Sequence, residues 1–227
     1  MDHVLDNPAW NALISGNQSL ALGTETVKFF PDDVAPFVGF REYSYENFEM
    51  LFQILKNKRQ CAFISSSEII FPSSWKIKER FNVLQMFYNK PTSPVIENKN
   101  IVTLGNHNIE EMIELTRLTH PGPFKESTIA FGHYEGIFED GNLIAMAGQR
   151  LHPRQYTEIS AVCTHPDYTK KGLASLLILS QVSRMLSSSQ IPFLHVLSDN
   201  IKAIQLYYNL GFVKRSDINI YLAEKNM

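Results

Sequence analysis

Apolar residues recur along the chain at helical or strand spacing, and this pattern predicts a series of short elements. In the N-terminal part, apolar positions 48, 51, 52 and 55 share one face and predict an amphipathic helix over Tyr45–Lys58. Short apolar runs predict strands over Cys61–Ile64 and Glu68–Phe71. Aromatic residues are frequent here, and we expect them in a core rather than around a ligand: Phe29, Phe30, Phe37, Phe40, Trp75, Phe81 and Phe87.

The pattern after residue 100 is easier to read, because capping and turn signals separate its segments. An apolar run predicts a strand over Ile101–Leu104. Asn108 is a good helix N-cap, and Glu111 three residues later predicts a capping box at the start of a helix. The pair Asp140-Gly141 lies between two apolar segments, 136–139 and 143–149, and predicts that they form a hairpin.

Strands and helices alternate after the hairpin. We expect a strand over Thr157–Thr164, a helix over Leu173–Leu186, a strand over Phe193–Leu197, a short helix from its cap Asn200 to Gly211, and a last strand over Asn219–Leu222. The order is strand, helix, antiparallel meander, helix, strand, helix, strand. It predicts an α/β fold of the mixed-sheet (α+β) kind, with a βα unit at its centre.

A polar segment with two prolines, residues 89–100, separates the two parts as a linker would. We therefore predict a smaller α/β N-terminal domain over residues 1–98 and a second domain over residues 99–227. A chain of 227 residues with 44% hydrophobic content can form such domains without disulfide or metal support.

Charge and cysteine content exclude several classes of protein. A net charge of −2 argues against a chain that binds nucleic acid by bulk charge. Cys61 and Cys163 lie far apart, so we expect no disulfide framework, and no ligand cluster predicts a metal. The sequence shows neither a secretory leader nor an apolar run of ~18 residues. We therefore expect a cytoplasmic protein that binds no membrane, as a monomer or a homodimer.

The loop between the strand 157–164 and the helix 173–186 has features of a phosphate site. A strand ends, a polar loop follows, and Gly172 and Ala174 keep large side chains away from the start of the helix. The N-terminus of a helix carries partial positive charge and free N–H groups, and Lys170 and Lys171 add charge. The loop is neither a Walker A motif nor a dinucleotide fingerprint, since their glycine spacings are absent.

Two motifs in this region resemble those of the GNAT superfamily of N-acetyltransferases. Residues 165–174 read H-P-x-Y followed by x-x-x-G-x-A, and residues 200–212 read N-x-x-A-x-x-L-Y-x-x-L-G-F. The run Glu158–Pro166 also resembles the branch that contains the C-terminal domain of glycine N-acyltransferases. The resemblance covers about residues 101–222. It implies an acetyl-CoA-dependent N-acetyltransferase that passes an acetyl group to a primary amine by direct attack in a ternary complex.

The resemblance also implies roles for particular residues. Tyr207 matches the tyrosine that protonates the leaving thiolate, and Asn200 matches an asparagine near the pantetheine. The remaining cofactor-binding residues would be Val162, Cys163 and Thr164 beside the pantetheine, and Lys170, Lys171, Gly172, Leu173, Ala174 and Ser175 around the pyrophosphate. Thr169 departs from the family, which commonly has Gln or Arg there.

The general base and the acceptor stay open. Glu158 opens the central strand and could act as the base through a water, with His152 and then His120 as rivals. We expect His165 and His195 to be structural and Cys163 to be a buried hydrophobe. The acceptor would be a small-molecule or peptide amine, and the N-terminal domain, a degenerate GNAT-like half, would shape its site. The alternative is a non-catalytic sensor or scaffold that binds acyl-CoA on the same fold.

Overall fold

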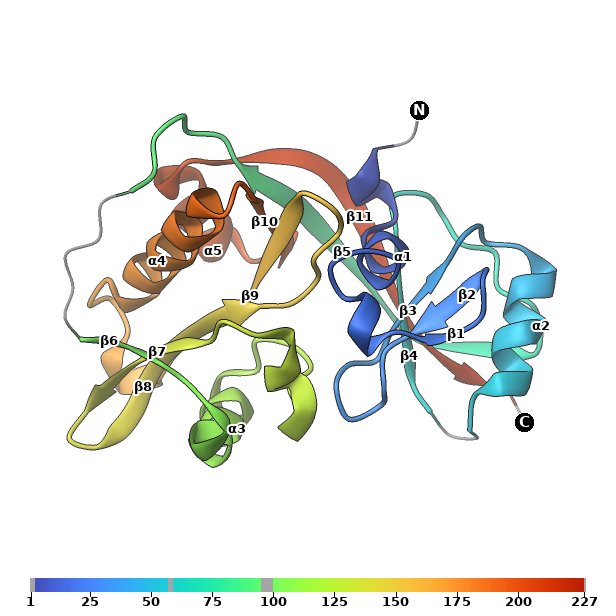
Figure 1. The fold of residues 1–227 in the computed structure, drawn as a ribbon, viewed down its shortest axis with the longest axis horizontal. Helices are drawn as coiled ribbons and strands as arrows, with labels where there is room; N and C mark the ends of the chain where they lie inside the picture. Colours follow the sequence, from blue (N-terminus) through green and yellow to red (C-terminus); the bar gives the residue numbers. More distant parts are fainter. Residues whose placement is uncertain (1–2, 57–58, 95–99, 227) are drawn as a thin grey trace.

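Eleven strands form one mixed sheet in the computed structural model, which describes residues 3–56, 59–94 and 100–226 (Figure 1). Their order across the sheet is β1-β2-β3-β4-β11-β5-β10-β9-β8-β7-β6. The strands are β1 (Leu22–Gly23), β2 (Val27–Phe29), β3 (Phe37–Phe40), β4 (Cys61–Ser65), β5 (Trp75–Tyr88), β6 (Ile101–Thr103), β7 (Glu135–Glu139), β8 (Asn142–Gln149), β9 (Tyr156–Thr164), β10 (Ile191–Leu197) and β11 (Phe212–Lys225).

Helices cover both faces of this sheet. The α-helices are α1 (Pro8–Leu13), α2 (Tyr45–Ile54), α3 (Ile109–Thr119), α4 (Leu173–Ser187) and α5 (Ile201–Leu210), and the 3-10 helices are η1 (Val4–Asp6), η2 (Gln18–Leu20), η3 (Asn106–Asn108), η4 (Glu126–Phe131) and η5 (Pro166–Tyr168). Helix α3 packs with Met146 and Cys163, whereas α4 packs with Ile144 and Ala147 of the same region. Among the described strands, β3–β4 and β9–β10 are the parallel pairs and the others are antiparallel, so the predicted mixed α/β architecture is confirmed.

The long strand β5 lies between β10 and β11 and joins the two parts of the chain. It pairs antiparallel with β10 over Val83–Phe87 and with β11 along nearly its whole length. In Figure 1, β5 and β11 run together from the half that holds α4 and α5 to the half that holds α2. The predicted boundary between residues 98 and 99 lies outside the described residues, and the division at that point stays a prediction. Strand pairing nevertheless crosses it.

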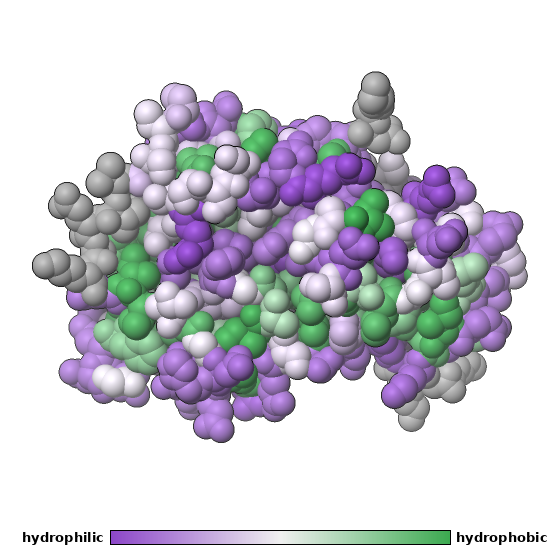
Figure 2. Space-filling model, in the orientation of Figure 1, coloured by the Kyte–Doolittle hydropathy of each residue, from purple (hydrophilic) through white to green (hydrophobic). Residues whose placement is uncertain are grey.

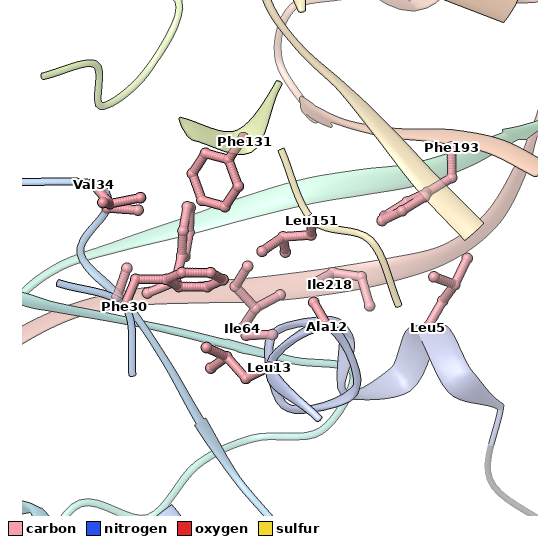
Figure 3. Close-up of a cluster of buried hydrophobic side chains, with 14 of the residues drawn as sticks. Leu5, Ala12, Leu13, Phe30, Val34, Ile64, Phe131, Leu151, Phe193 and Ile218 are labelled. Atoms are coloured by element: carbon pink, nitrogen blue, oxygen red, sulfur yellow. The ribbon is translucent and has the colours of Figure 1, made fainter. Parts of the chain in front are cut away.

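The central core also draws on both parts of the sequence. Figure 3 shows Leu5 and Leu13, from η1 and α1, in one cluster with Ile64, Phe193 and Ile218. These side chains come from the N-terminal helices and from β4, β10 and β11, and all are at least 99% buried. Burial of such side chains is the main favourable term in folding, so this cluster stabilises both halves together.

Most predicted elements are found close to their predicted positions. Helix α2 begins at Tyr45 as predicted and ends at Ile54, while the last two predicted residues, 57–58, lie outside the described residues. The hairpin turns at Asp140 and Gly141, whose φ angles of 51° and 80° suit a tight turn. Helix α5 begins after Asn200, whose side chain accepts from the Ala203 N–H, and ends at Leu210 with Gly211 as its C-cap.

Two predictions of local structure are wrong. Residues 68–71 form no strand, because β4 already has β3 and β11 as neighbours and leaves no free edge beside it. Ile69 instead fills the core, and Ile70 is 89% exposed. Helix α3 does begin after Asn108, but no capping box forms. The Asn108 amide oxygen accepts from the Gly105 N–H, and its nitrogen donates to the Glu111 carboxylate.

Figure 2 shows that the face viewed in Figure 1 is mostly hydrophilic, with hydrophobic residues in separate patches between polar ones. Among the described residues, no helix is long and apolar enough to span a membrane.

Candidate active site

The parallel strands β9 and β10 separate after a short paired stretch and leave a notch in the middle of the sheet. They pair only where Tyr156–Glu158 faces Ile191–Phe193. Beyond this point β9 contains a bulge opposite β8, and Ala161 has a φ of 51°, which is rare for a residue with a side chain. The bulge bends β9 away from β10, so one backbone edge of each strand lacks a partner strand.

A cavity of about 610 Å³ fills this notch. Six of the residues predicted to bind the cofactor or to act in catalysis line it: Val162, Cys163, Thr164, Ala174, Asn200 and Tyr207. The opposite wall comes from strands of the N-terminal part and from β11, with Phe37, Ala62, Phe81, Val83, Ile220 and Leu222. The fold therefore brings together predicted site residues that are far apart in the sequence.

Thr164 and Asn200 offer polar groups to this cavity. The Thr164 hydroxyl is buried and has no hydrogen-bond partner in the described part of the chain. A buried hydroxyl without a partner is costly, and a ligand in the cavity would remove that cost. The Asn200 oxygen caps α5, and its amide nitrogen donates to no described residue. Both side chains thus suit a polar ligand that runs along the notch.

Tyr207 places a phenol at the same cavity. It projects from α5, is 9% exposed, and packs its ring against Phe212. Burial raises the pKa of Tyr207 to about 12, so the hydroxyl keeps its proton at neutral pH. A buried phenol of this kind can donate a proton to an anion that forms beside it.

The loop before α4 exposes backbone N–H groups next to the notch. Lys170 and Gly172 both adopt left-handed backbone conformations, with φ of 63° and 78°. Gly172 is the N-cap of α4, and no side chain caps the first turn. A Cβ added at Gly172 would enter open space. Lys170, Lys171, Gly172, Leu173 and Ser175 are not among the cavity-lining residues, and the structure places them on the adjoining loop and first helical turn.

Two side chains of this loop are engaged locally. The Lys171 ammonium lies 4.5 Å from the centre of the Tyr168 ring, a cation–π contact. The Thr169 hydroxyl donates to the Pro166 carbonyl oxygen at 3.1 Å. Thr169 therefore stabilises the loop rather than extending toward the notch.

Glu158 does not face solvent but lies fully buried at the base of the notch. Arg150 contacts both carboxylate oxygens, with Nη2 2.6 Å from Oε1 and Nε 2.9 Å from Oε2. Burial alone would raise the pKa of Glu158. The Arg150 charge and the hydrogen bonds from Arg150 and His195 outweigh burial and hold this pKa far below its usual range. A carboxylate stabilised in this way is a weak proton acceptor, which argues against its predicted role as the base.

His195 lines the cavity, yet its side chain is only 2% exposed and both ring nitrogens have partners, in agreement with the structural role predicted for it. Its Nδ1 lies 2.7 Å from the Glu158 carboxylate, and its Nε2 lies 2.9 Å from the side-chain nitrogen of Gln85. The Gln85 nitrogen also donates to the Leu5 carbonyl, and its oxygen accepts from Arg215. These bonds fix the Gln85 amide so that it donates to Nε2, and the His195 proton therefore resides on Nδ1.

The other candidate bases and the cysteine occupy different environments. His152 packs on the N-terminal segment, where burial and the neighbouring His133 lower the pKa of His152 to about 4, and it does not line the cavity. His120 lines the cavity at its rim and has a φ of 50°. Burial raises the pKa of the Cys163 thiol to about 12, which makes it a poor nucleophile. Within the described residues, no cluster of His, Cys, Asp or Glu could hold a metal.

Comparisons with known proteins agree with this geometry. Residues 134–221 match the family model described as FR47-like protein. The solved structure of a protein assigned to the GNAT family of acetyltransferases, from Novosphingobium aromaticivorans, is 30% identical, with a TM-score of 0.92 and 100% of both chains covered. No curated protein matches the chain in sequence.

More distant solved structures share the fold. A GCN5-related N-acetyltransferase from Kribbella flavida has a TM-score of 0.63 at 14% identity, with 97% of this chain and 96% of that chain covered. A GNAT acetyltransferase from Colwellia psychrerythraea has a TM-score of 0.53 at 12% identity, with 89% and 84% covered. None of these matches distinguishes the glycine N-acyltransferase branch, which stays a prediction.

Proposed function

The chain belongs to the GNAT family of acetyltransferases, and from this premise we propose that it transfers an acetyl group from acetyl-CoA to a primary amine. The observation that carries the proposal is the cavity between β9 and β10, which is lined by residues from both sequence motifs and by the phenol of Tyr207. Direct attack of the amine, with both substrates bound together, needs one continuous cavity. The notch holds one such cavity, of about 610 Å³.

The residues present fit the pantetheine and pyrophosphate of acetyl-CoA. In our proposal, the free edge of β9 at Val162, Cys163 and Thr164 binds the pantetheine arm, and the unpartnered Thr164 hydroxyl and Asn200 amide donate to it. The uncapped N–H groups of Leu173, Ala174 and Ser175 bind the pyrophosphate, as helix N-termini bind anions. Lys170, Lys171 and Gly172 complete this cradle by adding charge and leaving space.

The chemistry needs a neutral amine, a stabilised carbonyl oxygen and a protonated leaving group. Backbone N–H groups of β9 would stabilise the oxygen as it gains charge. Tyr207, which burial keeps protonated at neutral pH, would donate its proton to the departing thiolate. We propose that Glu158 positions Arg150 and His195 at the base of the notch, because its own low basicity does not suit proton abstraction.

Titration calorimetry with acetyl-CoA, CoA and ATP tests the cofactor site. We expect dissociation constants for acetyl-CoA and CoA in about the micromolar range and far weaker ATP binding. A thiol-release assay with a set of amines then tests catalysis. Tight acetyl-CoA binding without thiol release from any amine would instead favour the non-catalytic sensor or scaffold. No binding of acetyl-CoA would contradict both.

A further inference from the structure

The cavity continues past the notch onto an apolar wall formed by other strands. Phe81 of β5 and Ile220 of β11 lie directly opposite each other in the antiparallel register, and Leu222 follows on the same face of β11. All three are only partly buried and pack on the central core with one side. Their other side lines the cavity. A group that enters beyond the cofactor site therefore meets hydrocarbon.

The charged groups around the cavity disfavour acceptors that carry a second positive charge. Among the described residues that line it, none is Asp or Glu, and the one side chain with a permanent charge is Arg150. A second ammonium group on an acceptor would lose its water there without gaining a carboxylate partner, which is costly. Polyamines and lysine-like amines thus suit this cavity poorly.

Arg150 has one guanidinium nitrogen left for a ligand. Its Nε and Nη2 both donate to Glu158, and the guanidinium lies 4.8 Å from the centre of the Phe37 ring. No described residue accepts from Nη1. Arg150 lines the cavity and its side chain is 13% exposed, so we take Nη1 as the donor that meets an oxygen of the acceptor. Guanidinium N–H groups bind carbonyl and carboxylate oxygens well.

The cavity also lacks an evident strong base. The Glu158 carboxylate is held by Arg150, and Nε2 of His195 already accepts from Gln85. A reactive amine must therefore lose its proton easily, to water or to His120 at the rim. An α-amino group next to a peptide carbonyl has a pKa of about 7.7–8.0, against about 10.4 for a lysine side chain. An apolar wall lowers the fraction of charged amine further.

These observations deepen the proposed function, on which they rest. We propose that the acceptor is a small α-amino compound with an apolar side chain and a carbonyl or carboxylate oxygen next to the amine. Arg150 Nη1 binds that oxygen, and Phe81, Ile220 and Leu222 contact the side chain. Amino-acid amides combine all three features, whereas free amino acids share the oxygen and the side chain but keep a more basic amine, because the neighbouring carboxylate favours the charged form. The experiment separates the two.

The transfer balances with the groups present. The amine lone pair forms a C–N bond to the thioester carbonyl carbon, and the C–S bond breaks with its electron pair on sulfur. Tyr207 gives its proton to the thiolate. The proton released from the attacking nitrogen passes to water, and Tyr207 regains a proton from water. The products are an N-acetylated α-amino compound and CoA with a free thiol.

A thiol-release assay with saturating acetyl-CoA tests the acceptor class. L-Leucine, L-leucinamide, 3-methylbutylamine, glycinamide and cadaverine are compared on the wild-type chain. Relative to leucinamide, 3-methylbutylamine lacks the carboxamide group, which also makes its amine more basic, and glycinamide lacks the side chain. All values of kcat/KM are therefore expressed per concentration of the neutral amine. We expect kcat/KM for leucine or leucinamide to exceed that for both analogues by about ten-fold or more, with cadaverine the poorest. The ratio of leucine to leucinamide tells whether a carboxylate or an amide carbonyl is preferred.

Two variants connect this preference to the residues. Arg150→Lys keeps a cation beside Glu158 but removes Nη1. We therefore expect the ratio of kcat/KM for leucinamide to kcat/KM for 3-methylbutylamine to fall to about three-fold or less. Ile220→Ser should reduce the advantage of leucinamide over glycinamide in the same way, and it remains informative if the Arg150 variant does not fold. Ile77→Ser, at an exposed position of β5 outside the cavity, is the control and should leave both ratios unchanged.

Results other than those expected above contradict the acceptor proposal. Cadaverine or 3-methylbutylamine used as well as leucinamide would overturn it, and so would ratios that both variants leave at the wild-type value. Calorimetric binding of acetyl-CoA without thiol release from any of the five amines would overturn the acceptor class and leave the cofactor site intact. Failure to bind acetyl-CoA would overturn the proposed function and this inference together.

Discussion

The side-chain nitrogen of Gln85 lies 2.9 Å from Nε2 of His195, although the two residues are 110 positions apart in the sequence. Gln85 is fully buried on β5 and also contacts Leu5 and Arg215. One amide thus holds the imidazole of β10, the N-terminal segment and β11 in fixed positions.

Replacement of this amide should destabilise the whole fold. Gln85→Leu removes the partner of the Leu5 carbonyl and of Nε2 of His195, and leaves Arg215 with Asp6 alone. We expect the free energy of unfolding to fall by about 2 kcal/mol or more, because each unsatisfied buried group costs about 1–3 kcal/mol. Urea unfolding measures the change. Gln205→Leu, on the exposed face of α5 where Gln205 donates only to Asn209, is the control and should have little effect.

The buried pair of Arg150 and Glu158 should make stability depend on pH in a defined direction. Glu158→Gln leaves the guanidinium charge uncompensated, and at neutral pH we expect it to cost about 3–5 kcal/mol in urea unfolding. The folded pKa of Glu158 lies below its unfolded value, so its contribution is complete above the unfolded pKa of about 4.3 and is lost as the pH falls below that value.

The difference in the free energy of unfolding between wild type and Glu158→Gln should therefore be constant from about pH 7 to about pH 5. It should become smaller below about pH 4. Glu25→Gln, at an exposed position, should show no such difference at any pH. A difference that grows on acidification would contradict the assigned ion pair.

Loss of the Tyr207 phenol should affect chemistry more than binding. In Tyr207→Phe we expect kcat to fall about 100-fold or more, because general acid assistance typically contributes about 10²–10⁴-fold. The calorimetric dissociation constant for acetyl-CoA should change little, since the ring and its packing on Phe212 remain. Tyr208→Phe, at the exposed neighbouring position, is the matched control. Equal turnover in the two variants would remove the acid role from Tyr207.

A methyl group at Gly172 should weaken cofactor binding. Gly172 has a φ of 78°, and an added Cβ enters open space where we place the pyrophosphate. Gly141 in the β7–β8 turn has a φ of 80° and also has free space around it, so Gly141→Ala carries the same backbone cost away from the notch. Each alanine should cost about 1–2 kcal/mol of stability. Only Gly172→Ala should raise the dissociation constant for CoA, by about ten-fold or more; equal constants would contradict the phosphate cradle.

Removal of the N-terminal part should prevent folding of the remainder. A chain that begins at residue 100 lacks β5, so β10 and β11 lose the strand between them. We expect no cooperative urea transition for this fragment alone, and recovery of one when residues 1–94 are co-expressed with it. A cooperative transition of the isolated fragment would show that the C-terminal part folds by itself.

Local signals in the sequence predicted most of the second half of the fold. Asn200 and Gly211 bound α5 through side-chain and backbone geometry that depends only on near neighbours. Asp140 and Gly141 specify the hairpin in the same way. Strand β5 was missed because its first half is charged and exposed and does not alternate: Lys76 is followed after Ile77 by Lys78, Glu79 and Arg80. Its position depends on pairing with β10 and β11, which no local pattern encodes.

In the candidate site, too, features encoded by local sequence were predicted and those that depend on tertiary contacts were not. The motif residues around Tyr207 and Thr164 were identified because they are grouped in short segments, and the structure brings them to one cavity. Glu158 was noticed at the start of a strand, but its partners Arg150 and His195 come from neighbouring elements. An apolar strand context indicated a core role for His195, and its side chain is indeed buried, but its partners Glu158 and Gln85 come from other strands. Electrostatic environments of this kind depend on tertiary contacts.

The position of β5 also has a consequence for synthesis of the chain. Residues 75–88 leave the ribosome early, but both strands that flank them, β10 and β11, are made last. Both edges of β5 therefore stay without a partner strand until residues 191–225 have emerged, and an open strand edge is a known route to aggregation. Charged residues in the first half of β5 reduce the risk of aggregation before β10 and β11 are made. Premature termination anywhere before residue 191 would yield a nascent chain that lacks both β10 and β11, so β5 would have no partner strand.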